Sequence, residues 1–372
     1  MRIKSSFPSH GYLIMSKKNI FIFPGDEIGP EITTEAIKII DFLNESKMTD
    51  IHYEFGDVGG ASLDKYNKPI TDETLEKARK SDAVLLASVG TPKYDNNTRE
   101  LKPEHGLLVL RKHLNLYINI RPIFVFNTLS EFSSLKSELI NDLDLVIIRE
   151  LIGDVYFGEP RGFKDVNGDK VGYNTMQYSE SEVQRITKFA IDIALKRNIH
   201  ITSVDKANVL ECSQLWRQTV DRIMQGHSNI DLQHMYVDNA AMQIIKNPKQ
   251  FDVILTPNLF GDILSDAASM LTGSIGLLPS ASLSETIGMF EPIHGSAPDI
   301  AGKGVVNPIA MILSLAMMFE YTFDRQDLAR IIKKSVDDVL ESGYFTKDLS
   351  QNDYITTNEM GDKILESIKK LC

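Results

Sequence analysis

Cysteine, tryptophan and long apolar runs are all scarce in this chain of 372 residues. The two cysteines, Cys212 and Cys372, match no metal-binding spacing and form no disulfide framework. That usage fits a reducing compartment, so we expect a cytoplasmic protein. The longest apolar stretches are interrupted by charge or proline, and none has the length of a membrane-spanning helix.

The glycine fingerprint of dinucleotide-binding Rossmann folds is also missing. No Gly-x-Gly-x-x-Gly motif follows a strand and opens a helix: Gly302-Lys-Gly304 lacks the third glycine, and Gly25-Asp-Glu-Ile-Gly29 has the wrong spacing. The sequence therefore gives no support to a Rossmann site.

Positive charge is in deficit, with 40 Lys and Arg against 51 Asp and Glu and a formal net charge of −11. Nucleic acids and anionic membranes would be repelled, so we expect neither as a general partner. An acidic protein can still bind an acidic small molecule where a few arginines converge. The length suits about two domains, and a hydrophobic share of 42% is ordinary for a globular protein.

The N-terminal stretch carries Arg2 and Lys4 but has no long apolar core and no evident cleavage site, which argues against a secretory signal. The first convincing strand begins near Asn19. We therefore expect residues 1–15 to form a poorly ordered extension, with organelle targeting as an open alternative.

Short apolar strands alternate with amphipathic helices along the chain, which is typical of an α/β fold with helices covering a sheet. The dipeptide Asn167-Gly168, between β-favouring flanks, predicts a hairpin, and 272–307 is expected to be a glycine-punctuated loop region. The predicted strands are 19–23, 51–55, 83–87, 117–121, 145–149, 199–204, 235–237 and 252–256. The predicted helices begin at Pro30 and Asn258 and span 71–81, 106–114, 181–197, 308–321, 325–342 and 359–371, with Asp324 as the cap of the helix at 325–342.

Two carboxylates lie four residues apart in the predicted helix that begins at Asn258. Asp262 and Asp266 would be neighbours on one face and would repel each other unless a positive group lay between them. Because the flanking residues are apolar or small, we expect this helix to be largely buried. Buried carboxylates favour a cation, and oxygen ligands suit Mg²⁺ or Mn²⁺. The alternative is one solvated aspartate and one that caps the helix.

Three arginines, Arg111, Arg121 and Arg149, lie at the ends of apolar elements, where a guanidinium group needs a carboxylate or phosphate partner. One such arginine is usually part of a structural ion pair, whereas three near Asp-rich strand ends favour a site for a di- or tricarboxylic acid. Lys206 follows a strand and could act as a base, and Tyr156 as a proton donor. Each of these two residues, taken alone, is more often solvated or packed.

The loop from Glu291 to Gly302 is rich in small residues and carries His294 and Asp299. It could wrap an adenosine, with Asp299 accepting hydrogen bonds from ribose hydroxyls. A plain surface turn is the alternative.

These segments occur in one order, and together they resemble the isocitrate/isopropylmalate dehydrogenase family of metal-dependent, β-decarboxylating 2-hydroxy-acid dehydrogenases. The matching segments are Gly25-Asp26 with Ile28-Gly-Pro-Glu31, Gly106 to Lys112, Asn119-Ile-Arg-Pro122, Tyr156 to Gly162, Ser203 to Glu211, Tyr236 to Met242, Asn258 to Asp266 and His294 to Ile300. The resemblance implies a two-domain fold that is not a Rossmann fold, with 16–116 and 273–372 in one domain and 117–272 in the other. It also implies a homodimer that pairs through the second domain and shares its active sites, the hairpin being an intersubunit arm.

The resemblance also implies roles for individual residues. Asp262 and Asp266 of one subunit, with Asp238 of the other, would hold Mg²⁺ or Mn²⁺, and Asp238 would also contact substrate. The three arginines would bind the carboxylates of a substituted malate, Lys206 of the partner subunit would take the hydroxyl proton, and Tyr156 would protonate the enol. The residues expected to bind NAD are Ile28, Glu104, Asn208, Glu291, His294, Gly295, Ser296, Ala297, Asp299, Ile300 and Asn307.

Substrate choice within the family depends on an apolar pocket. Leu107 and Leu108, with Val209 reaching across, would accept an isopropyl group, whereas the extra carboxylate of isocitrate would be left unpaired there. Asp299 favours NAD over NADP, because it would repel a 2′-phosphate. The expected reaction is oxidative decarboxylation of (2R,3S)-3-isopropylmalate to 4-methyl-2-oxopentanoate, a step of leucine biosynthesis.

Two alternatives to this reaction stay open. One is a dehydrogenase of another 3-substituted malate, of malate or of tartrate, and the other is a catalytically silent regulatory subunit. The chain also departs from the family pattern at Glu27, where glycine is usual, and at 91–95, where Thr-Pro-Lys-Tyr-Asp replaces Gly-Pro-Lys-Trp.

Overall fold

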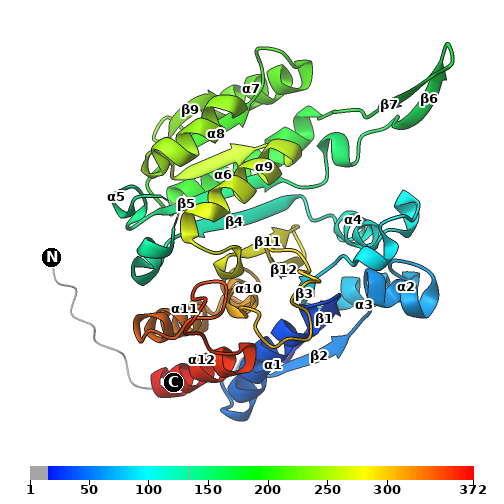
Figure 1. The fold of residues 1–372 in the computed structure, drawn as a ribbon. Coiled ribbons are helices and arrows are strands. Elements are labelled where there is room, and N and C mark those ends of the chain that lie inside the picture. The colour runs from blue at the N-terminus through cyan, green and yellow to red at the C-terminus, as the bar shows by residue number, and fades with distance from the viewer. Residues whose placement is uncertain (1–15, 134) are drawn as a thin grey trace.

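A ten-stranded sheet organises the chain in the computed structural model, which describes residues 16–133 and 135–372 (Figure 1). The expectation for residues 1–15 lies outside the described residues. The strand order is β2-β1-β3-β12-β11-β4-β5-β10-β8-β9. The strands are β1 (Lys18–Gly25), β2 (Ile51–Phe55), β3 (Ala83–Ser88), β4 (Ile118–Phe124), β5 (Asp144–Glu150), β8 (His200–Asp205), β9 (Asp231–Tyr236), β10 (Val253–Thr256), β11 (Pro279–Leu283) and β12 (Gly288–Pro292).

The sheet consists of two parallel blocks joined by an antiparallel middle. β2, β1, β3 and β12 run parallel to one another, and so do β5, β10, β8 and β9. β11 and β4 connect the blocks, because β11 pairs antiparallel with β12 and with β4, and β4 pairs antiparallel with β5. One block thus comes from the two ends of the described chain and the other from its middle. The exact domain boundaries given above stay a prediction.

Helices cover both faces of the sheet, as the buried strands of a parallel sheet require. Among the helices, α10 is apolar nearly all round and packs against β11 and β12, and α12 lies against α1 (Figure 1). The helices are α1 (Gly29–Glu45), α2 (Gly60–Tyr66), α3 (Asp72–Lys80), α4 (Pro103–His113), α5 (Ser137–Ile140), α6 (Glu180–Leu195), α7 (Glu211–Met224), α8 (Val237–Lys246), α9 (Asn258–Ser269), α10 (Ile309–Tyr321), α11 (Gln326–Glu341) and α12 (Thr357–Leu371). The predicted α/β class is confirmed. In the described part of the chain, no helix is long and apolar enough to span a membrane.

The predicted hairpin is confirmed as β6 (Gly162–Val166) and β7 (Asp169–Tyr173), which extend away from the rest of the molecule (Figure 1). Asn167 and Gly168 have φ angles of 57° and 85°. Two successive positive φ angles are what a tight hairpin turn needs, which explains the Asn-Gly signal.

Some local expectations were wrong. The region 272–307, predicted as loop, contains the two central strands β11 and β12. Both strands are buried, but their proline, serine and glycine residues are typical of loops. The helix α11 begins after Arg325 and has no side-chain cap, because Asp324 adopts a left-handed conformation instead. Residue Val237 opens α8 instead of ending a strand. Helix α9 is buried along one face only: half of its residues are buried, whereas Ile263 is more than half exposed.

The turn between β1 and α1 is built around Asp26, whose buried carboxylate accepts hydrogen bonds from the backbone amides of Gly60, Ala61 and Gly90 at 2.8–2.9 Å. The next residue, Glu27, has a φ of 53°, in the left-handed region that favours glycine. The structure therefore keeps at Glu27 a backbone conformation suited to the family's usual glycine.

Replacing Glu27 by glycine should relieve this backbone strain. We expect Glu27→Gly to raise the free energy of unfolding by about 1 kcal/mol. Glycine removes the strain of the left-handed conformation, and that gain exceeds the entropy that glycine adds to the unfolded chain. Urea unfolding measures the change. The control Glu27→Ala removes the charge but keeps Cβ, so an equal gain from alanine would contradict the backbone explanation.

Candidate active site

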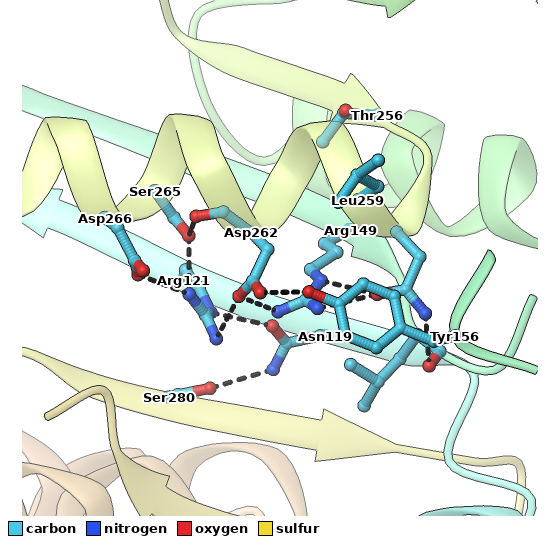
Figure 2. A network of polar contacts seen from close by, with 12 residues as sticks. Asn119, Arg121, Arg149, Tyr156, Thr256, Leu259, Asp262, Ser265, Asp266 and Ser280 are labelled. Carbon is cyan, nitrogen blue, oxygen red and sulfur yellow. Dashed lines mark hydrogen bonds and ion pairs between the residues drawn. The ribbon is translucent and has the colours of Figure 1, made fainter. Parts of the chain in front are cut away.

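Residues from β4, β5, α9 and the short turn Asp154–Tyr156 meet on one face of the sheet. Figure 2 shows Arg121 and Arg149 pointing from the strands toward Asp262 on the helix above them, with the ring of Tyr156 beside it. The β4–β5 register pairs Asn119 with Arg149 and Arg121 with Ile147. Because side chains alternate along a strand, Asn119, Arg121 and Arg149 emerge on the same face.

Asp262 is the centre of this cluster. Its carboxylate accepts hydrogen bonds from Arg149 Nη1 and from the Tyr156 hydroxyl, both at 2.6 Å, and lies 3.4 Å from Arg121 Nη2. Burial raises the pKa of Asp262, but the guanidinium groups of Arg149 and Arg121 outweigh burial and leave the pKa below its ordinary value. The carboxylate is therefore ionised at neutral pH.

The expected repulsion between Asp262 and Asp266 is offset by Arg121, which also pairs with Asp266 at 3.2 Å and with the Ser265 hydroxyl at 2.5 Å. Burial raises the pKa of Asp266 more than Arg121 lowers it. The two aspartates thus differ, since one is firmly held by two arginines and the other is more exposed and loosely held.

Arg149 is 2% exposed, and burial together with the nearby charge of Arg121 lowers its pKa to about 10. Close packing of α9 on β5 makes room for this arginine only because residue 261 is glycine: a Cβ there would lie 2.8 Å from the Arg149 side chain. Burial raises the pKa of Tyr156 to about 12, and its hydrogen bond to Asp262 adds to that shift, so the phenol stays protonated.

Arg111, the third predicted arginine, lies on α4 and pairs with Glu291 of β12 at 2.9 Å. Leu107 and Leu108 are half-buried on the preceding turn of α4. No contact among the described residues joins Arg111 directly to Asp262, although its charge contributes to the low pKa of Asp262.

Lys206 and Asp238 form a separate pair, with Nζ 2.8 Å from Oδ1. Val209 and Asn208, on the turn after Lys206, are exposed. Within the described part of the chain, no three carboxylate, histidine or cysteine side chains are close enough to hold a metal ion. A single chain therefore brings Asp262 together with Asp266 but keeps Asp238 apart from them. The oxygen donors suit Mg²⁺ or Mn²⁺.

The predicted cofactor loop lies against the β1–α1 turn, because the backbone amide of Ile28 donates to the carbonyl of Ser296 at 3.3 Å. A Cβ added to Gly90 would lie 3.1 Å from Glu104 Oε1 and 3.5 Å from Ser296 Oγ, so both side chains lie beside Gly90. Burial lowers the pKa of His294, which favours the neutral imidazole. Gly295 and Asp299 are exposed, and Ala297 and Ile300 are half-buried.

Asn307, another residue of the predicted NAD set, hydrogen-bonds within the protein. Its side chain accepts a hydrogen bond from the amide of Ile309 at 3.0 Å, at the start of α10, and donates to Asp348 at 3.1 Å. The carboxylate of Glu31 accepts from the amides of Gly302 and Gly304 and so fixes the end of the loop.

Four buried polar residues in this region escaped the sequence analysis: Glu150, Asp154, Tyr178 and Asn258. Asn258 and Asp154 lie in the segments that contain Asp262 and Tyr156. Because both are polar residues close to apolar strands, the sequence could have marked them as candidates. Tyr178 lies before α6 with no local pattern to mark it.

Comparison with known proteins gives one consistent result. A family model described as isocitrate/isopropylmalate dehydrogenase matches residues 19–364. The 3-isopropylmalate dehydrogenase of Pseudomonas syringae pv. syringae is 51% identical over 358 residues, which cover 95% of this chain and 99% of that protein. That of Thiobacillus denitrificans is 52% identical and covers 94% and 99%. The crystal structure of isocitrate dehydrogenase from Methylococcus capsulatus superposes with a TM-score of 0.85 at 33% identity, covering 95% and 99%.

Glu150 gives this region a testable pH dependence. Burial raises its pKa from 4.5 to about 7, so between these values the folded protein holds a proton that the unfolded chain releases, and stability falls as pH rises. Relative to Glu150→Gln, the wild type should lose about 3 kcal/mol across that window. Urea unfolding at its two ends tests this. Glu45→Gln, the same substitution at an exposed glutamate, is the control. A pH-independent gap between Glu150→Gln and wild type would contradict the assignment.

Proposed function

Because this chain belongs to the isocitrate/isopropylmalate dehydrogenase family, we propose that it oxidises and decarboxylates (2R,3S)-3-isopropylmalate to 4-methyl-2-oxopentanoate and CO₂ with reduction of NAD. The names of relatives that are about half identical over nearly the whole chain support this reaction. In that role the protein would serve leucine biosynthesis in the cytoplasm.

The single observation that carries the proposal is the convergence of Arg121 and Arg149 on Asp262 beside the Tyr156 hydroxyl. Two guanidinium groups next to cation-binding carboxylates form a site for an anion that is also a metal chelator, as a 2-hydroxy acid with two carboxylates is. Asp262 and Asp266 of one subunit, with Asp238 of its partner, would hold Mg²⁺ or Mn²⁺. When bound, the divalent ion would polarise the substrate's hydroxyl oxygen and carbonyl group.

The acid and base roles belong to the protein's own side chains. Tyr156 keeps its proton, with a pKa raised to about 12, so it is suited to donating a proton to the enol carbon at the end of the reaction. Lys206 would accept the hydroxyl proton. Arg111, Arg121 and Arg149 would hold the carboxylates. Leu107, Leu108 and Val209 would pack against the isopropyl group.

NAD would occupy the loop from Glu291 to Asn307 together with Ile28, Glu104 and Asn208. The contact between Ile28 and Ser296 supports this assignment, because it brings two segments of the expected cofactor site together. The exposed Asp299 carboxylate would accept from ribose hydroxyls and disfavour a 2′-phosphate.

A homodimer with shared sites is part of the proposal. On the adjacent helices α8 and α9, and just after α9, four apolar side chains are each more than half exposed: Met242, Ile245, Ile263 and Met270. This pattern is typical of a surface that another chain covers. The separation of the Lys206–Asp238 pair from Asp262 within one chain is what a shared site would produce. The hairpin β6–β7, whose Phe163 is 75% exposed, would be a second contact between subunits.

A substrate panel tests the reaction. NADH formation with Mg²⁺ should give a kcat/KM for 3-isopropylmalate at least about 10-fold above that for malate or tartrate, because burying the isopropyl group between leucines stabilises the transition state. Isocitrate should be poorer still. Equal values for isopropylmalate and malate would favour the broader malate or tartrate dehydrogenase, and no turnover of any acid would favour the silent regulatory subunit.

Mixing two inactive variants tests the shared site. Lys206→Ala and Asp262→Asn should each abolish turnover, but co-expression should restore about a quarter of wild-type activity per chain, since half of the dimers are mixed and each mixed dimer has one intact site. Turnover by Lys206→Ala alone would contradict the base role.

The matched control pairs Lys206→Ala with Asp238→Asn. Both residues would come from the same subunit at each site, so no mixed dimer has an intact site and activity should stay absent. Equal results from the two mixtures would contradict the sharing of sites.

A further inference from the structure

The side-chain amide of Asn258 joins three parts of the candidate site. Its oxygen accepts hydrogen bonds from Arg149 Nε at 2.9 Å and Nη2 at 2.6 Å. Its nitrogen donates to the carbonyls of Leu151 at 2.7 Å and Gly153 at 3.2 Å, in the turn that leads to Tyr156. Asn258 is 1% exposed and is the first residue of α9, so its four hydrogen bonds are shielded from water.

The start of α9 is tied to the same turn by its backbone. Pro257, at the N-cap, gives the helix no side-chain cap. Instead the amide of Asn258 donates to the Tyr178 hydroxyl at 2.9 Å, and the amide of Leu259 donates to the Asp154 carboxylate at 3.1 Å. These partners satisfy amides that a helix leaves unpaired at its N-terminus. Asp154 precedes Tyr156 by two residues, so the helix of Asp262 and the turn of Tyr156 are held as one unit.

The guanidinium group of Arg149 makes hydrogen bonds on two sides, and the Asn258 amide occupies one of them. Nε and Nη2 are held by Asn258, whereas Nη1 points at Asp262 at 2.6 Å. An amide oxygen fixes the plane of the guanidinium group but carries no charge, so Asn258 adds no second negative charge beside Arg149 to compete with a bound anion. A carboxylate in its place would add such a charge.

We propose that Asn258 is a positioning residue that fixes the guanidinium plane of Arg149 relative to Asp262 and Tyr156, and so determines how tightly a carboxylate of the substrate is bound. The proposal rests on the proposed function, in which Arg149 binds substrate. Asn258 itself acts through Arg149 and through the turn before Tyr156. A misplaced guanidinium group weakens both binding and alignment, because the reaction requires a defined geometry.

The test is a double-mutant cycle with Asn258→Ala and Arg149→Lys. We expect Asn258→Ala to raise KM for 3-isopropylmalate by about 10- to 100-fold, to lower kcat less, and to leave KM for NAD within about twofold. In the Arg149→Lys background, Asn258→Ala should raise KM little further, because there is no guanidinium plane left to hold. The proposal would be overturned if Asn258→Ala raised the substrate KM by the same factor in the Arg149→Lys background as in the wild type. An unchanged substrate KM in Asn258→Ala alone would also overturn it.

Controls separate positioning from simple loss of stability. Asn44 holds the α1–β2 turn through hydrogen bonds to Thr49 and to the backbone of Ile51, so Asn44→Ala should lower the unfolding midpoint without changing either KM. If Asn258→Ala does not fold, Asn258→Ser, which keeps a shorter acceptor, takes its place with an expected smaller rise in KM. An unchanged KM in that variant would overturn the proposal as well.

Calorimetric titration of the same variants with 3-isopropylmalate and Mg²⁺ needs no turnover, so it separates this inference from the proposed function. Wild-type binding without turnover would contradict the proposed reaction, yet the weaker binding expected of Asn258→Ala would still support the positioning role. Absence of wild-type binding would overturn both.

Discussion

Two arginines held side by side on one face of the sheet are the constraint around which the candidate site is built. Arg121 and Arg149 repel each other, and the charge of Arg121 is one reason that the pKa of Arg149 falls to about 10. Buried positive charges need partners, and Asp262 lies within 3.4 Å of both. Helix α9 must therefore pack closely on the strands, which the glycine at 261 permits.

The sheet topology explains why these arginines meet. β4 lies between the two blocks, because it pairs antiparallel with β5 on one side and with β11, which joins β12, on the other. Its register with β5 places Asn119 opposite Arg149. Asn119 reinforces this junction, because its amide donates to Ser280, to the carbonyl of Ala281 and to Ser282 on β11, while its oxygen accepts from Arg121 Nε. The site thus forms where the two blocks join.

Several features were predictable from local pattern alone. β2 was predicted with its observed ends, and the hairpin turn at Asn167-Gly168 followed from the need for positive φ angles. The ordered motifs indicated the family, and the comparisons confirm it. The central strands β11 and β12 were missed, because their burial depends on neighbours far away in sequence and their own residues read as loop. The exposed face of α9 was misjudged for a related reason: apolar residues indicate burial, yet one chain leaves Ile263 exposed.

The sequence by itself determined the chemical inventory: three arginines, paired aspartates, a lysine and a tyrosine, in an order that identifies a family. Residue types and short spacings carry that information because they are local. Only the tertiary structure decided that Arg121 lies between Asp262 and Asp266, that Arg111 pairs with Glu291, and that Lys206 pairs with Asp238 apart from them. It also revealed Asn258 as the link between Arg149 and the turn of Tyr156. Such contacts join residues up to 180 positions apart, and only the packing of strands and helices brings them within hydrogen-bonding distance.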